Sequence, residues 1–173
     1  MQEYRKLVDA ARHKGKKRLA MIIQTLCATG IRISELSYVT VESIRNGEIE
    51  IYCKKKHRKA LIPEKLQKLL FEYIKENNIE SGVVFRTSRG NAVDRSNVWK
   101  EMKALTEEAK VAEEKIFPHN LRHLFAKVFY SVGNDIAKLA DVLGHSSIET
   151  TRLYIMTTSE EHKKMLNRME LVI

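Results

Sequence analysis

Residues 117–126, FPHNLRHLFA, place three ionisable side chains, His119, Arg122 and His123, at the predicted start of a helix. Pro118 suits the first turn of a helix, and apolar residues follow it. His119 and Arg122 are three residues apart, so they share one face of that helix. The N-terminal end of a helix favours anions, and an arginine fork fits two phosphate oxygens. The stretch is therefore compatible with a phosphate site or with an ordinary helix start that carries solvated charges.

The same stretch invites a metal-site hypothesis, because His119 and His123 are spaced like the histidines of His-Glu-x-x-His zinc helices. Asn120 stands where that motif needs its glutamate, and Arg122 would place a fixed positive charge beside the cation. The two cysteines of the chain are far apart and form no zinc-ligand pattern. We therefore expect no metal here.

The composition indicates a folded domain with an anionic partner. The chain has 173 residues, 43% of them hydrophobic, with only 7 glycines and 2 prolines. This length suits one domain with a real core. Lys and Arg outnumber Asp and Glu by 31 to 22, a net charge of +9 that favours nucleic acid as the partner. The chain carries no signal peptide, membrane-length apolar run or disulfide framework, so we expect a cytoplasmic protein without a membrane partner.

The pattern of residues predicts a mainly helical α+β fold, with helices around a small three-stranded antiparallel sheet. Residues 4–29 read as two helices broken at Gly15. An Asn-Gly turn precedes a β-hairpin over residues 48–63, whose tip is the basic run KKKHRK, and GVVF at 82–85 reads as a third strand. Further helices are predicted over residues 34–44, 64–78, 94–110, 119–132, 135–143, 147–156 and 159–168.

Two more motifs contain residue types suited to phosphate chemistry. In TGIRISEL, residues 29–36, Arg32 follows a glycine that ends a helix, and Glu35 could orient its guanidinium. In LGHSSIETTRLY, residues 143–154, His145 lies in the predicted corner between two helices, where Ser146 and Glu149 fit a capping box. Each motif taken alone is equally compatible with an ordinary surface or loop position.

The tyrosine at the end of the second motif has two interpretations. Tyr154 is flanked by Leu153 and Ile155 on an apolar helix, and a tyrosine in such a place is more often part of the core than a nucleophile. On the residues alone the core interpretation is favoured.

The set of motifs resembles the catalytic domain of the tyrosine recombinases, the phage integrase family. The chain presents, in order, Arg in TGxRxSEL, lysines in a basic hairpin, His-x-x-Arg-His, Leu-Gly-His, and a tyrosine nine residues after that last histidine. The resemblance covers about residues 4–165. It implies the fold of the DNA breaking-rejoining enzymes and site-specific recombination of double-stranded DNA through a covalent 3′-phosphotyrosine, with no metal or other cofactor.

The resemblance assigns a role to the ionisable and nucleophilic side chains of these motifs. Tyr154 would attack the scissile phosphodiester, and Arg32 and Arg122 would clamp its non-bridging oxygens. His145 would donate a hydrogen bond to one of those oxygens. His119 would help to deprotonate the tyrosine or would bind the phosphate.

A hairpin lysine would act as the general acid in such an enzyme. The usual hairpin has glycine beside that lysine, whereas this chain reads YCKKKHRKALIP. We choose Lys54, directly after the first strand, with Lys55 and Lys56 as alternatives. The lysines that do not act as the acid, together with Arg58, are expected to contact DNA phosphates.

Other residues receive supporting roles from the resemblance. Glu35 would support the active site, and His123 would pack or orient its neighbours. Enzymes of this type assemble as synaptic tetramers on DNA. We expect the chain to be a monomer when it is not bound to DNA. The C-terminal tail would dock on a neighbouring protomer or pack on its own domain, through Leu166, Met169, Leu171 and Val172. Residues 1–173 are expected to form one catalytic domain, a fragment that lacks the N-terminal DNA-gripping domain.

Two alternatives remain open at this point. A catalytically silent DNA-binding module could keep the fold, but the complete set of candidate catalytic residues argues against it. A type IB topoisomerase would share the chemistry, but the spacing within LGHSSIETTRLY favours a recombinase.

Overall fold

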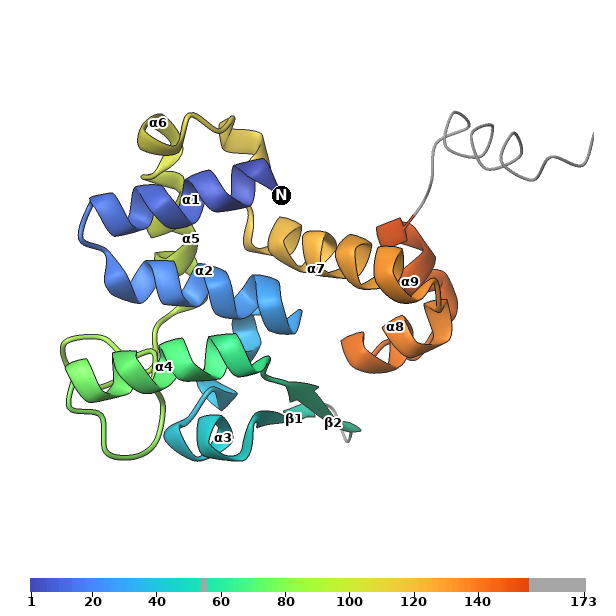
Figure 1. Cartoon of the computed structure of the whole chain (residues 1–173), viewed down its shortest axis with the longest axis horizontal. Coiled ribbons are helices and arrows are strands. Elements are labelled where there is room, and N and C mark those ends of the chain that lie inside the picture. The colour runs from blue at the N-terminus through green and yellow to red at the C-terminus, as the bar shows by residue number, and fades with distance from the viewer. Residues whose placement is uncertain (54–55, 156–173) are drawn as a thin grey trace, which may run out of the picture.

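Gly15 separates the first two helices, as the sequence predicts. The computed structural model describes residues 1–53 and 56–155, which are mainly helical (Figure 1). The α-helices are α1 (Gln2–His13), α2 (Lys17–Thr29), α3 (Val41–Asn46), α4 (Glu64–Glu76), α5 (Arg95–Lys103), α6 (Thr106–Ala109), α7 (Pro118–Gly133), α8 (Ile136–Leu143) and α9 (Ile148–Ile155). Two 3-10 helices, η1 (Ile33–Tyr38) and η2 (Glu113–Lys115), and the strands β1 (Glu48–Cys53) and β2 (Lys56–Leu61) complete the elements of the described residues.

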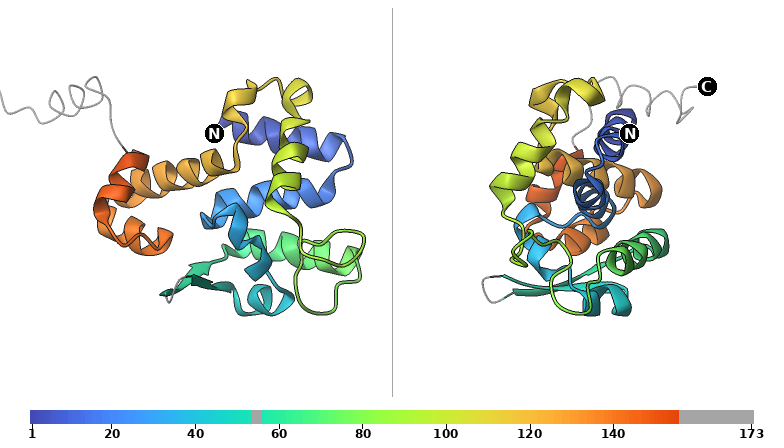
Figure 2. Two further views of the ribbon diagram at one scale, coloured as in Figure 1. Left: turned by 180° about the vertical axis from the view of Figure 1, so that it is seen from behind. Right: turned by 90° about the vertical axis from the view of Figure 1, so that its left-hand side faces the viewer.

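Helix α2 forms the centre of the main core. Its apolar residues on several faces are buried, including Leu19, Ile22, Ile23 and Leu26 at 0% exposure. A helix that is apolar around most of its circumference must be covered on all sides. Helices α1, α4, α5 and α7 supply that cover: α1 and α4 run beside α2 in Figure 1, and α5 crosses it on the opposite face in Figure 2.

The β-hairpin is confirmed, but the sheet of the described residues has two strands rather than the expected three. Strands β1 and β2 pair antiparallel, from Glu48 opposite Leu61 to Cys53 opposite Lys56. Val83, in the predicted third strand, makes only an isolated bridge with Thr40. The chain between η1 and α3 is extended over just two residues, so it offers no longer edge for a third strand to pair with.

Two predicted helices are interrupted. The stretch predicted as one helix over residues 34–44 divides into η1 and α3, because Thr40 caps α3 by accepting a hydrogen bond from Ser43 N at 3.1 Å. The stretch predicted over residues 94–110 divides into α5 and α6, and Asp94 caps α5 as predicted. The helix predicted over residues 159–168 lies outside the described residues.

The last three described helices carry a second, smaller core. Helix α7 packs on α2 at its start and carries α8 and α9 at its far end (Figure 1). Ala126, Leu139, Leu143 and Tyr154 are buried together between these helices. Tyr154 is therefore a core residue as well as the candidate nucleophile. Among the described residues, none of the helices has the length and apolar character that a membrane crossing requires.

Candidate active site

Arg122 lies at the centre of the candidate site and is only 1% exposed. Its Nη1 donates to the Gly30 carbonyl at 2.5 Å, and its Nη2 donates to the Leu143 carbonyl at 2.8 Å. The Nε atom is buried and has no hydrogen-bond partner among the described residues. No carboxylate of the described chain pairs with this guanidinium either. A buried cation without an acidic partner is costly, and an anionic ligand would compensate it.

His145 lies beside Arg122 because Gly144 ends α8 in the left-handed conformation, with φ 67°. Its Nε2 atom is 2.9 Å from Arg122 Nη2, and its Nδ1 atom is 2.9 Å from Thr151 Oγ1. A guanidinium can only donate, so Nε2 accepts and the proton resides on Nδ1. Thr151 is not predicted from the sequence as a site residue, although it precedes Tyr154 by three positions and therefore shares its helix face.

Tyr154 is 8% exposed and lies within a group of imidazole rings. Its hydroxyl is 3.2 Å from His119 Nε2. The ring of His123 stacks on the tyrosine ring with centroids 4.2 Å apart and an interplanar angle of 28°. The His119 and His123 rings meet edge to face at 4.7 Å. No group of three or more His, Cys, Asp or Glu in the described part of the chain could hold a metal ion.

Glu35 links two arginines at the edge of the site. Its Oε1 accepts from Arg32 Nη1 at 3.0 Å, and its Oε2 accepts from the Arg32 backbone N–H at 2.7 Å. Arg58 Nη2 donates to the same Oε2 at 2.6 Å, and Arg58 Nη1 donates to the Val142 carbonyl at 3.2 Å. The Arg58 side chain, expected at a basic tip facing DNA, is therefore 13% exposed and connects β2 with η1 and α8. It also packs so closely on Gly144 that a Cβ there would overlap it.

The electrostatics of the site follow from several cations in a partly buried space. Burial, with the charge of Arg32, lowers the pKa of Arg122 to about 10, while the Tyr154 hydroxyl opposes the shift. Burial, followed by the charges of Arg122 and Arg32, lowers the pKa of His145 to about 4. The same causes lower the pKa of His119. Both histidines are therefore neutral at pH 7, and a bound anion would reverse the effect of the arginine charges.

The structure thus brings together Arg32, Arg122, His119, His145 and Tyr154, with Glu35 and His123 beside them. Lys54 and Lys55 lie outside the described residues, as does the C-terminal tail from residue 156. Lys56 begins β2, and its side chain is not described. The predicted cap of the last helix is corrected: Ser147, not Ser146, accepts a hydrogen bond from Glu149 N, at 3.2 Å. Helix α9 begins at Ile148, so residue 147 occupies the cap position.

Comparisons with known proteins find relatives of this chain. Residues 1–161 match the model of the phage integrase family. The tyrosine recombinase XerA of Pyrococcus furiosus is 30% identical over 99% of this chain and 61% of its own length. The tyrosine recombinase XerD of Chlamydia trachomatis is 35% identical over 82% of this chain and 49% of its own length.

Solved structures are similar across nearly the whole chain. A crystal structure of XerA recombinase superposes with a TM-score of 0.81 and 25% identity, covering 99% of this chain and 62% of that one. The XerH recombinase bound to a palindromic difH substrate superposes with a TM-score of 0.79 and 23% identity, over 94% of this chain and 50% of that one, and this likeness shows the fold alone. The chain spans about half to three-fifths of the length of these curated relatives.

Proposed function

We propose that this chain, which belongs to the phage integrase family, cleaves and rejoins double-stranded DNA in site-specific recombination. The observation that carries the proposal is the buried guanidinium of Arg122, which has no acidic partner among the described residues and lies beside the candidate nucleophile. A DNA phosphodiester supplies the missing negative charge.

The first step forms a bond between the Tyr154 oxygen and phosphorus and breaks the bond from phosphorus to the 5′-oxygen. The products are a 3′-phosphotyrosyl linkage and a 5′-hydroxyl end. The neutral His119 ring, 3.2 Å from the tyrosine hydroxyl, takes the phenolic proton. Arg32 and Arg122 bind the non-bridging oxygens as charge develops on them.

His145 changes its hydrogen-bonding role when the phosphate enters. Without a ligand its Nε2 accepts from Arg122. A phosphate beside the arginines raises its pKa, so the ring gains a proton on Nε2 and donates to a phosphate oxygen. Thr151 keeps the ring orientation through Nδ1.

The leaving 5′-oxygen needs a proton from a general acid. A lysine of the hairpin supplies it, Lys54 in our assignment, with Lys55 or Lys56 as alternatives. Rejoining is the reverse reaction, in which a 5′-hydroxyl attacks the phosphotyrosine and the tyrosine recovers its proton. No step uses a metal ion, and we therefore expect the reaction to proceed in EDTA.

The test is covalent capture of DNA. Nicked duplexes with randomised flanking sequence are incubated with the chain, and SDS-resistant adducts are isolated and their DNA is sequenced. We expect an adduct with an enriched sequence, formed equally well in EDTA, and none with Tyr154→Phe. Tyr130→Phe, a tyrosine of α7 for which no hydrogen bond of the side chain is seen among the described residues, is the matched control and keeps the adduct. An adduct that persists in Tyr154→Phe contradicts the nucleophile assignment.

Two assays separate the recombinase from the alternatives. A plasmid with two copies of the enriched site reports recombination, and a supercoiled plasmid reports relaxation. Exchange between the sites supports the recombinase. Relaxation without exchange supports a topoisomerase, and binding without an adduct supports a silent module.

The active form is proposed to be a tetramer that holds two duplexes, built from chains that are monomeric without DNA. Such an assembly would act on DNA in the cytoplasm or nucleoid. Light scattering of the chain, alone and with the enriched duplex, tests the change in mass.

A further inference from the structure

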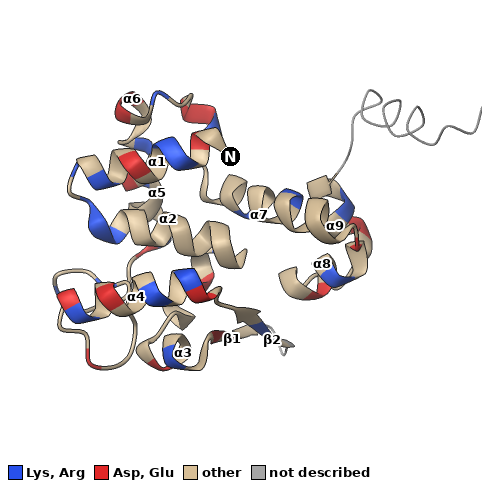
Figure 3. Ribbon diagram, in the orientation of Figure 1, with Lys and Arg blue, Asp and Glu red and all other residues tan. Residues whose placement is uncertain are grey.

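A basic cavity lies at the opposite end of α2 from the candidate active site. Its volume is about 760 Å³, and its walls come from the start of α2, the end of α4, the loop that precedes α5, and α5 itself. Its lining includes four cations, Lys16, Lys17, Arg18 and Arg86, and one acid, Glu101. Figure 3 shows blue residues where α1 leads into α2, and this part of the chain contributes Lys16 and Lys17 to the cavity lining.

Two of the four cations have acidic partners that help to build the wall. Arg18 Nη2 donates to Glu101 Oε1 at 2.8 Å, and its Nη1 donates to the Arg86 carbonyl at 3.0 Å. Lys17 Nζ pairs with Glu76 at 3.2 Å on the exposed rim. The two Arg18 contacts hold the loop that carries Arg86 against α2 and α5, and the Lys17–Glu76 pair joins α2 to α4.

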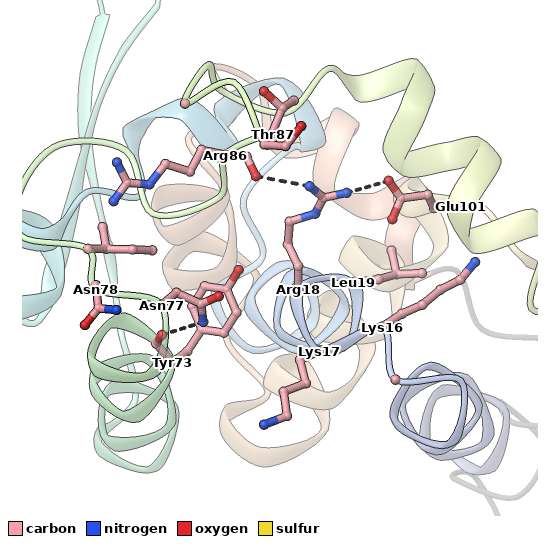
Figure 4. A pocket seen from close by; sticks show the side chains of 14 residues that line it. Lys16, Lys17, Arg18, Leu19, Tyr73, Asn77, Asn78, Arg86, Thr87 and Glu101 are labelled. Carbon is pink, nitrogen blue, oxygen red and sulfur yellow. Dashed lines mark hydrogen bonds and ion pairs between the residues drawn. The ribbon is translucent and has the colours of Figure 1, made fainter.

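The other two cations, Lys16 and Arg86, have no hydrogen-bond or ion-pair partner for their side chains within the described residues. They lie on either side of Arg18 in Figure 4. Burial raises the pKa of the Tyr73 hydroxyl, and the charges of Arg18 and Arg86 oppose that rise, so both guanidiniums lie near this hydroxyl. The cavity therefore holds uncompensated positive charge at two separated points.

Helix α2 sets the separation between this cavity and the candidate active site. Its 13 residues, Lys17–Thr29, end directly before Gly30, whose carbonyl accepts the hydrogen bond from Arg122. At 1.5 Å per residue the helix is about 20 Å long. Phosphates of one DNA strand follow each other at about 3.4 Å along the duplex axis, so on a duplex that runs parallel to α2 this length would correspond to about six base pairs.

We propose that the cavity binds backbone phosphates of the DNA duplex that flanks the cleavage position, with Lys16 and Arg86 as the contacting residues. The inference rests on the proposed function and extends it to a second DNA-binding site. Two separated cations can each neutralise a different phosphate of the DNA backbone. Contacts of this kind fix the position of the duplex without reading its sequence.

The test measures the salt dependence of duplex binding by fluorescence anisotropy of the whole chain. Each phosphate contact adds about 0.9 to the slope of log K against log salt concentration. The double variant Lys16→Gln, Arg86→Gln should lower the steepness of that slope by about 1.8. The matched control is Arg5→Gln, Lys6→Gln on α1, which removes the same charge from two exposed positions and should leave the slope near the wild-type value.

The outcomes distinguish this proposal from the proposed function. Both double variants should keep the wild-type melting temperature, which shows that the cavity residues act on binding and not on folding. An unchanged slope in a wild-type-like cavity variant overturns the second site while leaving DNA cleavage intact. A wild-type chain that binds no duplex at any salt concentration overturns the proposed function itself. Binding of pyrophosphate to the wild type and to the cavity variant is measured in parallel by calorimetry. A cavity variant that loses pyrophosphate binding but keeps the wild-type duplex slope assigns the cavity to small phosphates and also overturns the proposal.

Discussion

At the scale of single residues, the decisive feature is that the buried Arg122 is surrounded by hydrogen-bond acceptors that carry no charge. Its partners are two main-chain carbonyls and the Nε2 atom of His145. These contacts fix the plane of the guanidinium, while its charge remains available to a ligand. An arginine paired with a buried carboxylate would be fixed equally well but would attract an anion less strongly.

Arg122→Lys tests this arrangement while it keeps the charge. A lysine ammonium cannot reach two carbonyls and an imidazole in the fixed plane of a guanidinium fork. We expect the rate of adduct formation to fall at least about 100-fold, as for the loss of one oxyanion donor. The control is Arg152→Lys on α9, whose side chain is 65% exposed and pairs with Glu149. A rate within a few-fold of wild type in Arg122→Lys would contradict the clamp.

The histidines make stability depend on pH in a known direction. Burial, with the arginine charges, lowers the pKa of His145 to about 4, from an unfolded value near 6.5. Between these values the unfolded chain binds a proton that the folded chain does not, so the free energy of unfolding falls as the pH is lowered from 6.5 towards 4. Denaturant unfolding across this range should show the loss. His145→Gln should reduce the change of the unfolding free energy with pH. His13→Gln, at an exposed position of α1, should leave that change as it is in the wild type.

At the scale of elements, the site is assembled from the ends of helices. The C-terminal cap of α2, the first turns of α7, the corner between α8 and α9, and the start of η1 each supply one or two groups. Gly30 shows why these ends must be placed accurately. It has φ +65°, and a Cβ at this position would lie 2.5 Å from Phe125 Cδ1 on α7.

Gly30→Ala should therefore disturb both stability and catalysis. The left-handed backbone costs about 1 kcal/mol with a side chain present, and the clash with Phe125 adds about 1–3 kcal/mol. Gly15→Ala is a matched control, since Gly15 has φ +66° and, apart from its chain neighbours, no described residue lies within 4 Å of the point that a Cβ would occupy there. Urea unfolding should show the larger loss for Gly30→Ala. Equal losses of unfolding free energy in the two variants would mean that Phe125 moves aside without cost, which contradicts a close α2–α7 contact at Gly30.

The bridge through Glu35 should hold the hairpin against the rest of the site. Glu35→Gln removes the charge that Arg32 and Arg58 share, and it breaks the pair between the 6% exposed Glu35 and the 13% exposed Arg58 side chain. Breaking a buried ion pair in this way costs about 3 kcal/mol or more. Glu149→Gln, which breaks an exposed pair with Arg152, should cost less than about 1 kcal/mol. Similar losses in the two variants, measured by urea unfolding, would show that Glu35 does not act as a bridge.

At the scale of the whole molecule, sequence patterns predict what depends on local order and miss what depends on tertiary contact. Gly15, Gly30 and Asp94 mark helix ends correctly, because caps are local. The third strand fails because strand propensity around Val83 says nothing of the length of the edge available for pairing. Sequence alone places Arg58 at the surface, since nothing in a basic run indicates that one member turns inward to a distant carboxylate.

The whole molecule carries a charge of +9 and concentrates part of it at the candidate site. A divalent anion that binds there should stabilise the folded chain, and at about ten times its Kd the gain is about 1.4 kcal/mol. For a domain of this size that corresponds to a rise in melting temperature of about 3–6 °C. Sulfate compared with chloride at equal ionic strength provides the measurement. Arg32→Gln, which removes a 42% exposed guanidinium, should lose most of this rise. General salting-out acts equally on wild type and variant, so an undiminished rise in Arg32→Gln would place the anion elsewhere.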